Sequence, residues 1–468
     1  MIYRLQKIFT WEVKSMEPVI NVKHGEEKLV SHSGLLSVGA LLEDMQLTER
    51  LTNIPGIHCV QPVISHGDVL SSMVGLICVG KPDYSAIEIF RQDPLFFTQS
   101  LRISDCPSQS TLRQRIDLIG EFANTILKEA SAEMISAKAP VVSPIQTSAG
   151  LFVPLDMDVS PFDNSKTRKE GVSRTYKGSD GFAPVFAYLG TEGYLINVEL
   201  REGSQHCQKN TPEFVDETLK YVRQITDAPL LIRLDSGNDS QDNFVVGEKW
   251  ENVDFLVKRN LRRESLNDWL NLAKDTDTAT CLRSNHKTVW IGKTEVGVTG
   301  KSLPRPIVFK VTERYEKKGQ ALLIPIIEVE TYWCTVRNLK PQEVINLYHD
   351  HGTSEQFHSE IKSDLDLERL PSQFFASNSL ILHLALLAYN ILRIVGQVSI
   401  EEQDEYKLPA NRYKKPKRRR LRTVMQDIIY MAGRLTKSGR RWFISFGQIN
   451  PFSGLAENVL KRLRCCPG

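Results

Sequence analysis

The sequence predicts an α/β protein in which a helical region precedes a mixed β-sheet that carries a β-rich insertion. Three observations lead to this fold class. Residues 34–53 and 110–137 show the apolar periodicity of helices. From residue 151 onward, apolar runs of strand length alternate with helical patterns, which is typical of a mixed α/β sheet. Residues 281–336 are then rich in β-type runs, and helical character returns from Pro341.

Bulk composition is that of an ordinary globular chain, 41% hydrophobic and 25% charged. A length of 468 residues exceeds one compact core, so we expect several lobes. The net charge of +3 neither requires nor excludes a nucleic-acid partner. The eight cysteines are scattered without a C-x-x-C pair, which favours a reducing, cytosolic setting over a zinc site or a disulfide framework.

The longest apolar run, Leu380 to Val398, is interrupted by polar side chains such as His383 and Arg393. This composition indicates a buried helix rather than a membrane span, and we expect no membrane partner.

A capped helix is predicted near residue 110, with Ser108 or Ser110 as its N-cap and Arg113 and Arg115 in its first turns. Arginines behind a tight turn are typical of the recognition helix of a helix-turn-helix. An ordinary capped surface helix is the alternative. Residues 139–149 then predict a linker into the sheet.

The sheet elements follow in order. The segments that predict strands are 151–159, 183–190, 193–201, 229–237 and 254–259, with a helix near 211–227 and another before the last strand.

Two of these strands end in aspartate. Asp156 and Asp158 point to one face of their strand because side chains alternate with a period of two. Asp235 precedes Ser-Gly where the next strand runs into a turn. At least one of the first two aspartates is expected to face solvent at the strand end.

A predicted helix contributes a third carboxylate. Tyr348, His351, Glu355 and Lys362 project within roughly 60° of one another on that helix. Three carboxylates on rigid elements suit a divalent-metal site for phosphodiester chemistry. The alternative is an amphipathic helix with a solvated polar face.

The run RYKKPKRRRLR (412–422) has eight basic residues in eleven and none acidic. Such a run favours contact with a phosphate backbone. A solvated linker and a nuclear-localisation-like patch are the alternatives. The basic side chains proposed to contact DNA here are Lys414, Lys415, Lys417, Arg418, Arg419 and Arg420.

These motifs in order resemble the DDE transposases of bacterial insertion sequences, in the branch with the signature Tyr-x2-Arg-x3-Glu-x6-Lys. The segment YHDHGTSEQFHSEIK (348–362) fits that spacing, NSLILHLALLAYNILR (378–393) resembles the stretch that follows it, and LDMDVS and LIRLDSGN resemble the two aspartate motifs. GSDGFAPVFAYLG and LREGSQHC are similar to the intervening strands, and SQSTLRQR to the N-terminal DNA-binding region.

The resemblance implies an RNase H-like mixed-sheet core with a β-rich insertion. The implied division is a helical N-terminal DNA-binding region (1–145), the first part of the catalytic core (146–262), the insertion (263–338), the C-terminal helices of the core (339–400) and a basic C-terminal region (401–468).

The resemblance also implies roles for single residues. Asp158, Asp235 and Glu355 would be the catalytic, metal-binding triad, and Asp158 is preferred to Asp156 because it fills the D-x-T slot. Tyr348, His351 and Lys362 would contact DNA, with Tyr348 and Lys362 binding phosphates. His351 stands where the signature has arginine, and its imidazole lacks the bidentate grip of a guanidinium.

The implied activity is cleavage and strand transfer at the inverted ends of an insertion sequence, with two Mg²⁺ ions per site and Mn²⁺ as an alternative. The implied partners are double-stranded DNA and a second copy of the chain on that DNA, in the bacterial cytoplasm at the nucleoid. Trp333 and Trp290 are candidates for stacking an extruded base, with core packing as the alternative. Two other functions stay open: an RNase H-like nuclease without strand transfer, and a DNA-binding descendant that has lost turnover.

Overall fold

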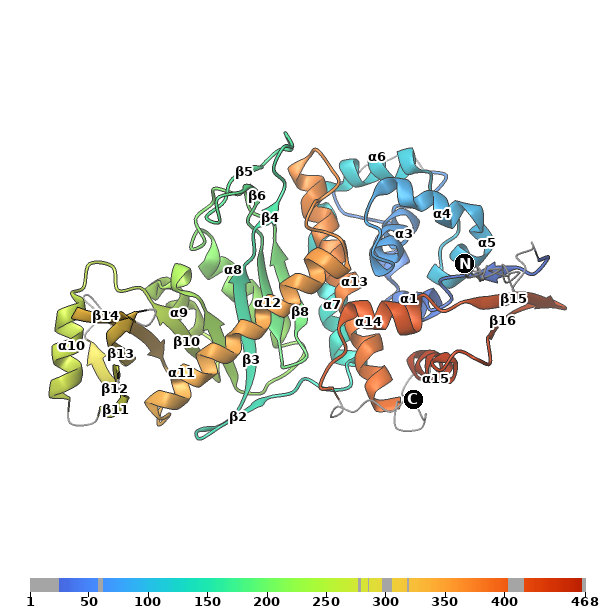
Figure 1. Cartoon of the computed structure of the whole chain (residues 1–468). Helices are drawn as coiled ribbons and strands as arrows, with labels where there is room; N and C mark the ends of the chain where they lie inside the picture. Colours follow the sequence, from blue (N-terminus) through green and yellow to red (C-terminus); the bar gives the residue numbers. More distant parts are fainter. Residues whose placement is uncertain are drawn as a thin grey trace, which may run out of the picture.

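The computed structural model describes residues 25–57, 62–276, 279–284, 286–296, 305–317, 320–402 and 416–464. Its main feature is a mixed ten-stranded sheet (Figure 1). The strand order is β11-β12-β13-β14-β10-β9-β3-β7-β8, with β2 also paired to β3. The bounds are β2 (Ile145–Thr147), β3 (Gly150–Val159), β7 (Val185–Leu189), β8 (Tyr194–Glu199), β9 (Leu230–Leu234), β10 (Val253–Arg259), β11 (Thr280–Ser284), β12 (Lys287–Val296), β13 (Arg305–Lys317) and β14 (Gln320–Cys334).

The middle of this sheet is parallel. β9 pairs in parallel with both β3 and β10, whereas β7 and β8 run antiparallel to their neighbours. Strands β3 and β9 are almost wholly buried, which explains their near-continuous apolar sequences. Helices α8 (Thr211–Val222) and α9 (Gln241–Gly247) connect β8, β9 and β10. The mixed α/β sheet predicted from the sequence is therefore present.

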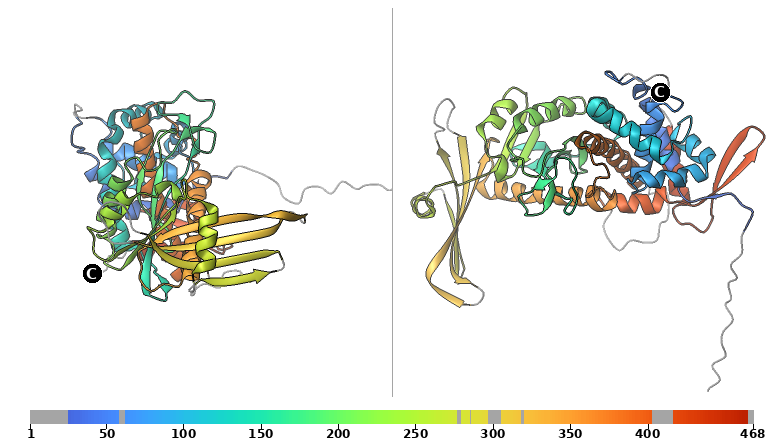
Figure 2. Two further views of the ribbon diagram at one scale, coloured as in Figure 1. Left: turned by 90° about the vertical axis from the view of Figure 1, so that its left-hand side faces the viewer. Right: turned by 90° about the horizontal axis from the view of Figure 1, so that it is seen from above.

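The predicted β-rich insertion is built from antiparallel strands that extend this same sheet. β14 pairs with β10, so the strands β11–β14 continue from the parallel part without a break in hydrogen bonding. Helix α10 (Leu266–Asp275) packs on them through Trp269 and Leu270. These strands project at one end of the molecule (Figure 2).

Helices dominate the chain before the sheet. They are α1 (Leu35–Asp44), α2 (Leu47–Arg50), α3 (His66–Cys78), α4 (Ile87–Gln92), α5 (Pro94–Leu101), α6 (Gln109–Ile119) and α7 (Asn124–Lys138), with 3-10 turns η1 (Tyr84–Ala86) and η2 (Gly120–Ala123). The helix expected over 110–137 is divided, because Gly120 takes φ +49° and ends α6. The linker expected at 139–149 contains the short strand β2.

The long helix α13 (Phe375–Glu402) joins these helices to the sheet (Figure 1). Asn390 on α13 accepts a hydrogen bond from the Leu195 N–H at 2.9 Å and donates to the Leu195 carbonyl at 2.6 Å. These bonds satisfy backbone groups of β8 at the sheet edge. Among the described residues, α13 alone is long and apolar enough to cross a membrane, and its apolar window is entirely buried inside the protein.

The remaining elements flank this core. A helical segment of α11 (Pro341–Asp350), η4 (His351–Thr353), α12 (Ser354–Ser359) and the π-turn η5 (Glu360–Asp364) crosses the sheet (Figure 1). A small sheet contains β4 (Phe162–Asp163), β6 (Asp180–Phe182) and β5 (Ser173–Arg174). The C-terminal part contains α14 (Leu421–Val424), the π-turn η7 (Met425–Ile429), β15 (Gly433–Ser438), β16 (Arg441–Phe446) and α15 (Ser453–Arg464).

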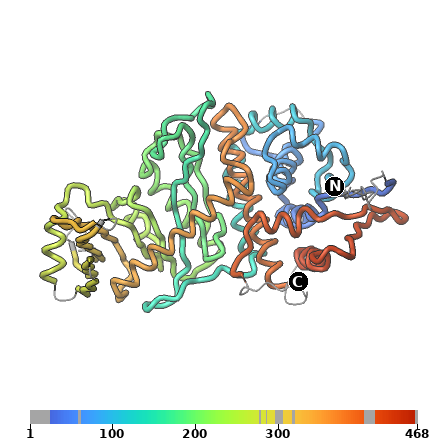
Figure 3. The backbone as a smooth tube through the Cα atoms, viewed as in Figure 1, coloured from blue at the N-terminus to red at the C-terminus, as the bar shows by residue number. Residues whose placement is uncertain are grey.

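Strand β1 (Leu29–Val30) pairs with β15, so a segment near the N-terminus and the C-terminal hairpin form one three-stranded sheet (Figure 3). The sequence predicted only a basic region after residue 401 and did not predict this hairpin.

Candidate active site

Two carboxylates lie at neighbouring strand ends. In the parallel register of β3 and β9, Met157 pairs with Leu234. Asp158 directly follows Met157, and Asp235 directly follows Leu234. Both line one cavity of about 510 Å³, which is also bordered by Tyr176 and the 203–207 segment. The sequence-predicted pair of aspartates is therefore brought together by the sheet.

Asp156 has a different environment from Asp158. Its side chain is 3% exposed, and both carboxylate oxygens accept hydrogen bonds from the Arg233 guanidinium, at 2.6 and 2.7 Å. The His351 Nδ1 donates to the same carboxylate at 2.9 Å. Burial works to raise the pKa of Asp156, but Arg233 and His351 hold it below its usual value. The Asp156 carboxylate is thus bound by protein side chains, which favours Asp158 as the ligand facing the cavity.

Asp158 lies beside a buried histidine. The His358 Nε2 is 3.4 Å from Asp158 Oδ2, and the Tyr188 hydroxyl is 3.1 Å from His358 Nδ1. Burial raises the pKa of Tyr188, so its phenol keeps a proton to donate to Nδ1. Burial also lowers the pKa of His358, which is neutral at neutral pH with its remaining N–H on Nε2, facing Asp158.

The charge state of Asp158 follows from the same surroundings. Burial works to raise its pKa, but the adjacent His358 side chain and the Val159 N–H, at 2.7 Å from Oδ1, hold the pKa below its usual value. The carboxylate is ionised at neutral pH and can bind a cation.

A tyrosine on the helical segment that crosses the sheet holds Asp235. The Tyr348 hydroxyl donates to Asp235 Oδ1 at 3.1 Å, and the Ser236 N–H donates to the same oxygen at 2.6 Å. Burial and the Asp235 charge raise the pKa of Tyr348. Tyr348, predicted as a phosphate contact, here orients the second aspartate.

Glu355 is exposed on α12 and lines a separate cavity of about 480 Å³. That cavity also contains Arg418 and Arg420. Among the residues that the structure describes, no group of three or more His, Cys, Asp and Glu side chains is close enough to hold a metal ion. The structure therefore unites two of the three predicted carboxylates in one cavity and leaves Glu355 outside it.

Two further signature residues have partners inside the protein. His351 is buried and binds Asp156, as described above. The Lys362 ammonium donates to the Pro161 carbonyl at 2.6 Å, and burial lowers its pKa. Their predicted contacts with DNA stay predictions, and the partners seen here are structural.

The arginines of the basic run are also paired. Arg418 contacts Glu360, Arg419 lies 3.0 Å from Asp427 and Arg420 lies 2.8 Å from Asp364. Glu360 in addition contacts Arg393 of α13. The pairs of Arg418 and Arg420 fasten the segment after residue 416 to η5, whereas the pair of Arg419 lies within the C-terminal part. Lys417 is exposed, whereas Lys414 and Lys415 lie outside the described residues.

In the helical region, Ser108 is the N-cap of α6, with its side chain accepting from the Thr111 N–H. Arg113 is exposed and Arg115 is half-buried, with a guanidinium nitrogen 3.5 Å from His66 Nδ1. Ser108 is one of the two caps predicted, and DNA contact by these arginines stays a prediction.

Both candidate tryptophans are buried. Trp333 is 5% exposed and donates from Nε1 to Asp239 at 2.9 Å, while its ring packs against Phe244. Trp290 is 8% exposed, with the Lys274 ammonium 5.5 Å from its ring centre. The structure favours the packing alternative for both rings, and base stacking stays a prediction.

Sequence reasoning missed Arg233, His358 and the cavity wall formed by Arg174 and Tyr176. One signal was present for Arg233. It lies two residues before Asp235, as Asp156 lies two before Asp158, so the two side chains share a face of adjacent strands. A buried aspartate requires such a partner.

Asp158 and Asp235, at adjacent strand ends, form a candidate two-carboxylate site. The family model described as "Transposase DDE domain group 1" matches residues 13–467, and the chain belongs to this family. A search of curated proteins finds no match. Among solved structures, the chain is similar to "Cryo-EM structure of piggyBac transposase synaptic complex with hairpin DNA (SNHP)", with a TM-score of 0.40, 9% identity, and coverage of 94% of this chain and 83% of that chain.

Proposed function

We propose that the protein is a metal-dependent transposase that cleaves DNA at the ends of an insertion sequence and joins the freed 3′ ends to new DNA. Membership of the DDE family supports a role in transposition. The observation that carries the finer proposal is the placement of Asp158 and Asp235 at adjacent parallel strand ends, within one cavity. The order β10-β9-β3-β7-β8 supports an RNase H-like core, with three parallel strands followed by two antiparallel ones.

DDE transposases generally use divalent metal ions, and the donor set fits such an ion. Carboxylate oxygens are hard ligands, and Mg²⁺ in phosphate enzymes is usually held by one or two carboxylates together with substrate phosphates. Asp158 and Asp235 would hold the metal, with Mg²⁺ or Mn²⁺ as the ion. When bound, divalent ions activate the attacking hydroxyl and neutralise the leaving oxygen.

The chain's own groups prepare this site. Tyr348 orients Asp235 through a hydrogen bond, while His358, which is bonded to Tyr188, lies 3.4 Å from Asp158. Because Glu355 is exposed on the same helical segment, we propose that it joins the two aspartates when DNA and metal are bound. A second copy of the chain on the DNA would bring two ends together.

The test is an assay with purified protein, a duplex carrying the element's own end, and Mg²⁺ or Mn²⁺. The wild type is compared with Asp158→Asn, Glu355→Gln and the control Asp350→Asn, which removes an exposed carboxylate from α11. We expect cleaved and joined products from the wild type and the control, and neither from the other two variants.

Other outcomes would identify the alternatives. Cleavage without joined products would indicate a nuclease without strand transfer. Binding of the DNA end by all four proteins, with no cleavage even by the wild type, would indicate a DNA-binding descendant that has lost turnover. Full activity of Glu355→Gln would remove Glu355 from the catalytic set.

A further inference from the structure

The β15–β16 hairpin carries a cluster of basic side chains without acidic partners. Residues 431–450 contain Arg434, Lys437, Arg440 and Arg441 and no aspartate or glutamate. All four are exposed. Across the described part of the chain, none of the four makes an ion pair or a side-chain hydrogen bond. The hairpin therefore differs from the 418–420 segment, whose arginines are all bound to carboxylates.

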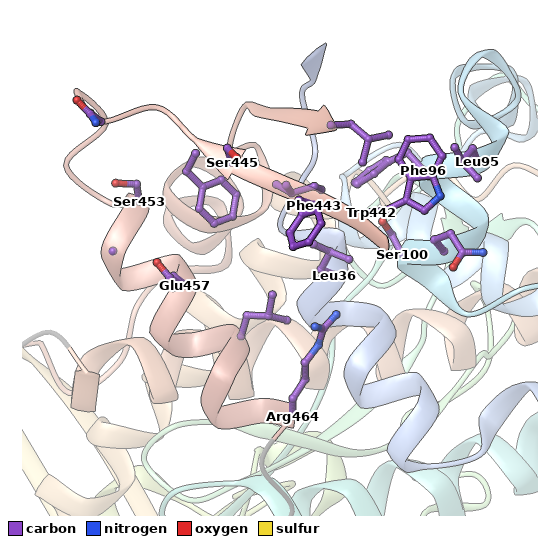
Figure 4. A pocket seen from close by; sticks show the side chains of 17 residues that line it. Leu36, Leu95, Phe96, Ser100, Trp442, Phe443, Ser445, Ser453, Glu457 and Arg464 are labelled. Atoms are coloured by element: carbon purple, nitrogen blue, oxygen red, sulfur yellow. The ribbon is translucent and has the colours of Figure 1, made fainter. Parts of the chain in front are cut away.

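The base of the hairpin is fixed to the protein. Leu435 is buried, and Ile444 and Phe446 pack against the core. Nearer the turn, Trp442 lines a pocket of about 550 Å³ together with Leu95 and Phe96 of α5 (Figure 4). The pairing of β1 with β15 adds a third strand at this end. The hairpin is thus a supported ribbon, which limits the conformational entropy lost on binding.

The tip of the hairpin is open. Gly439 adopts φ +60°, and a Cβ atom placed there would meet no atom within 4 Å. Arg440 and Arg441 follow directly, and Ser438 pairs with Arg441 across the strands. The Lys437 ammonium lies 5.3 Å from the ring centre of Trp442, which supports its position. Both Figure 1 and the right-hand view of Figure 2 show the hairpin projecting at the end of the molecule opposite β11–β14.

We propose that this hairpin is a binding site for the phosphate backbone of duplex DNA, separate from the catalytic cavity. A two-stranded ribbon is narrow enough to enter a major groove about 12 Å wide, where its cations reach phosphates on either side. Guanidinium and ammonium groups without a protein counter-charge release counterions from DNA when they bind. The inference extends the proposed function, since a transposase must hold DNA beyond the scissile bond.

The test is equilibrium binding of the full-length chain to a 30-base-pair duplex of arbitrary sequence, measured by fluorescence anisotropy from about 50 to 200 mM salt. The variant Lys437→Gln/Arg440→Gln/Arg441→Gln removes three cations. If each contacts one phosphate, the slope of log K against log salt becomes shallower by about 2.7, or 0.9 for each contact. The advantage of the wild type over the variant then shrinks about 40-fold across this salt range.

Two controls separate contact from net charge and from folding. Lys437→Arg/Arg440→Lys/Arg441→Lys keeps the charge and should keep the slope. Arg91→Gln/Lys220→Gln/Lys249→Gln removes three exposed charges from α4, α8 and the end of α9, and should leave the slope near that of the wild type. Thermal melting of each variant confirms that it is folded.

An unchanged slope and affinity in the Gln variant would overturn the proposal, as would an equal loss in the Arg91, Lys220 and Lys249 variant. Because the duplex carries no element end, the result does not depend on cleavage. A wild type that binds through the hairpin but never cleaves would leave this inference standing and remove the proposed function.

Discussion

Arg233→Met tests whether the buried ion pair beneath the candidate site holds β3, β9 and the crossing helical segment together. The guanidinium makes two hydrogen bonds to Asp156 on β3, and its Nη1 donates to the Leu347 carbonyl of α11 at 2.8 Å. Methionine has a similar length but removes the charge and all three bonds. Asp156 then keeps only His351 as a partner.

The magnitude follows from burial. The side chains of Arg233 and Asp156 are 4% and 3% exposed, so neither charge is compensated by water. Removing one partner of a buried pair costs about 3–5 kcal/mol because the remaining charge is left without its counter-charge. We expect the free energy of unfolding to fall by that amount.

The assay is urea denaturation followed by tryptophan fluorescence and by circular dichroism. The matched control is Arg91→Gln on α4, which breaks a pair with Glu88 whose side chains are 44% and 47% exposed. It should cost less than about 1 kcal/mol. In a double-mutant cycle, Asp156→Asn should recover part of the loss in Arg233→Met, since it removes the uncompensated charge.

A loss below about 1 kcal/mol for Arg233→Met would refute this reasoning, because an exposed pair behaves in that way. Equal losses in Arg233→Met and in the double variant would show that the charge of Asp156 is not the cause.

Three further predictions concern the helices and the insertion. Burial lowers the pKa of His383 to about 4, whereas in the unfolded state it is about 6.5. The unfolded state therefore binds the proton first, and the free energy of unfolding falls as the pH drops from about 6.5 to 4. His383→Gln should remove roughly 3 kcal/mol of this pH dependence, measured as the free energy of unfolding over that range. His351→Arg introduces the residue that the predicted signature has at this position, and places a second guanidinium beside Arg233. It should lower the free energy of unfolding in urea by about 1–3 kcal/mol, whereas an unchanged midpoint would mean that the site has room for the larger side chain. Trp333→Phe loses the hydrogen bond to Asp239 and should lower the free energy of unfolding by about 1 kcal/mol. DNA cleavage should stay within about two- to three-fold of the wild type. A far larger loss of cleavage would support base stacking by Trp333.

Much of the fold was predictable because local patterns determine it. The apolar runs before Asp158 and Asp235 predict buried strands, and both strands lie in the parallel middle of the sheet. A serine cap near residue 110 follows from local sequence, and the structure selects Ser108 over Ser110. The hairpin at residues 433–446 was missed although its own pairing is local, with Gly439 in its turn; only its pairing with β1 joins distant parts of the chain.

The site was predictable only in part. A spacing of residues on a helix gives the face on which they lie but not their partners, and so His351 was expected to face phosphate rather than Asp156. The basic run likewise gave charge without its counter-charges, because Glu360 lies 58 residues before Arg418 and Asp364 lies 56 residues before Arg420 in sequence. Long-range contacts of this kind leave no local signal.

The most direct test of the central claim is metal rescue of Asp158→Cys and Asp235→Cys in the cleavage assay. Thiolates are poor ligands for Mg²⁺ and better ones for Mn²⁺, so both variants should be inactive with Mg²⁺ and regain cleavage with Mn²⁺. Asp156→Cys, whose side chain contacts Arg233 rather than the cavity, should show no such rescue. Cleavage by both variants with Mg²⁺, or rescue of Asp156→Cys alone, would contradict the assignment of Asp158 and Asp235 as the metal ligands.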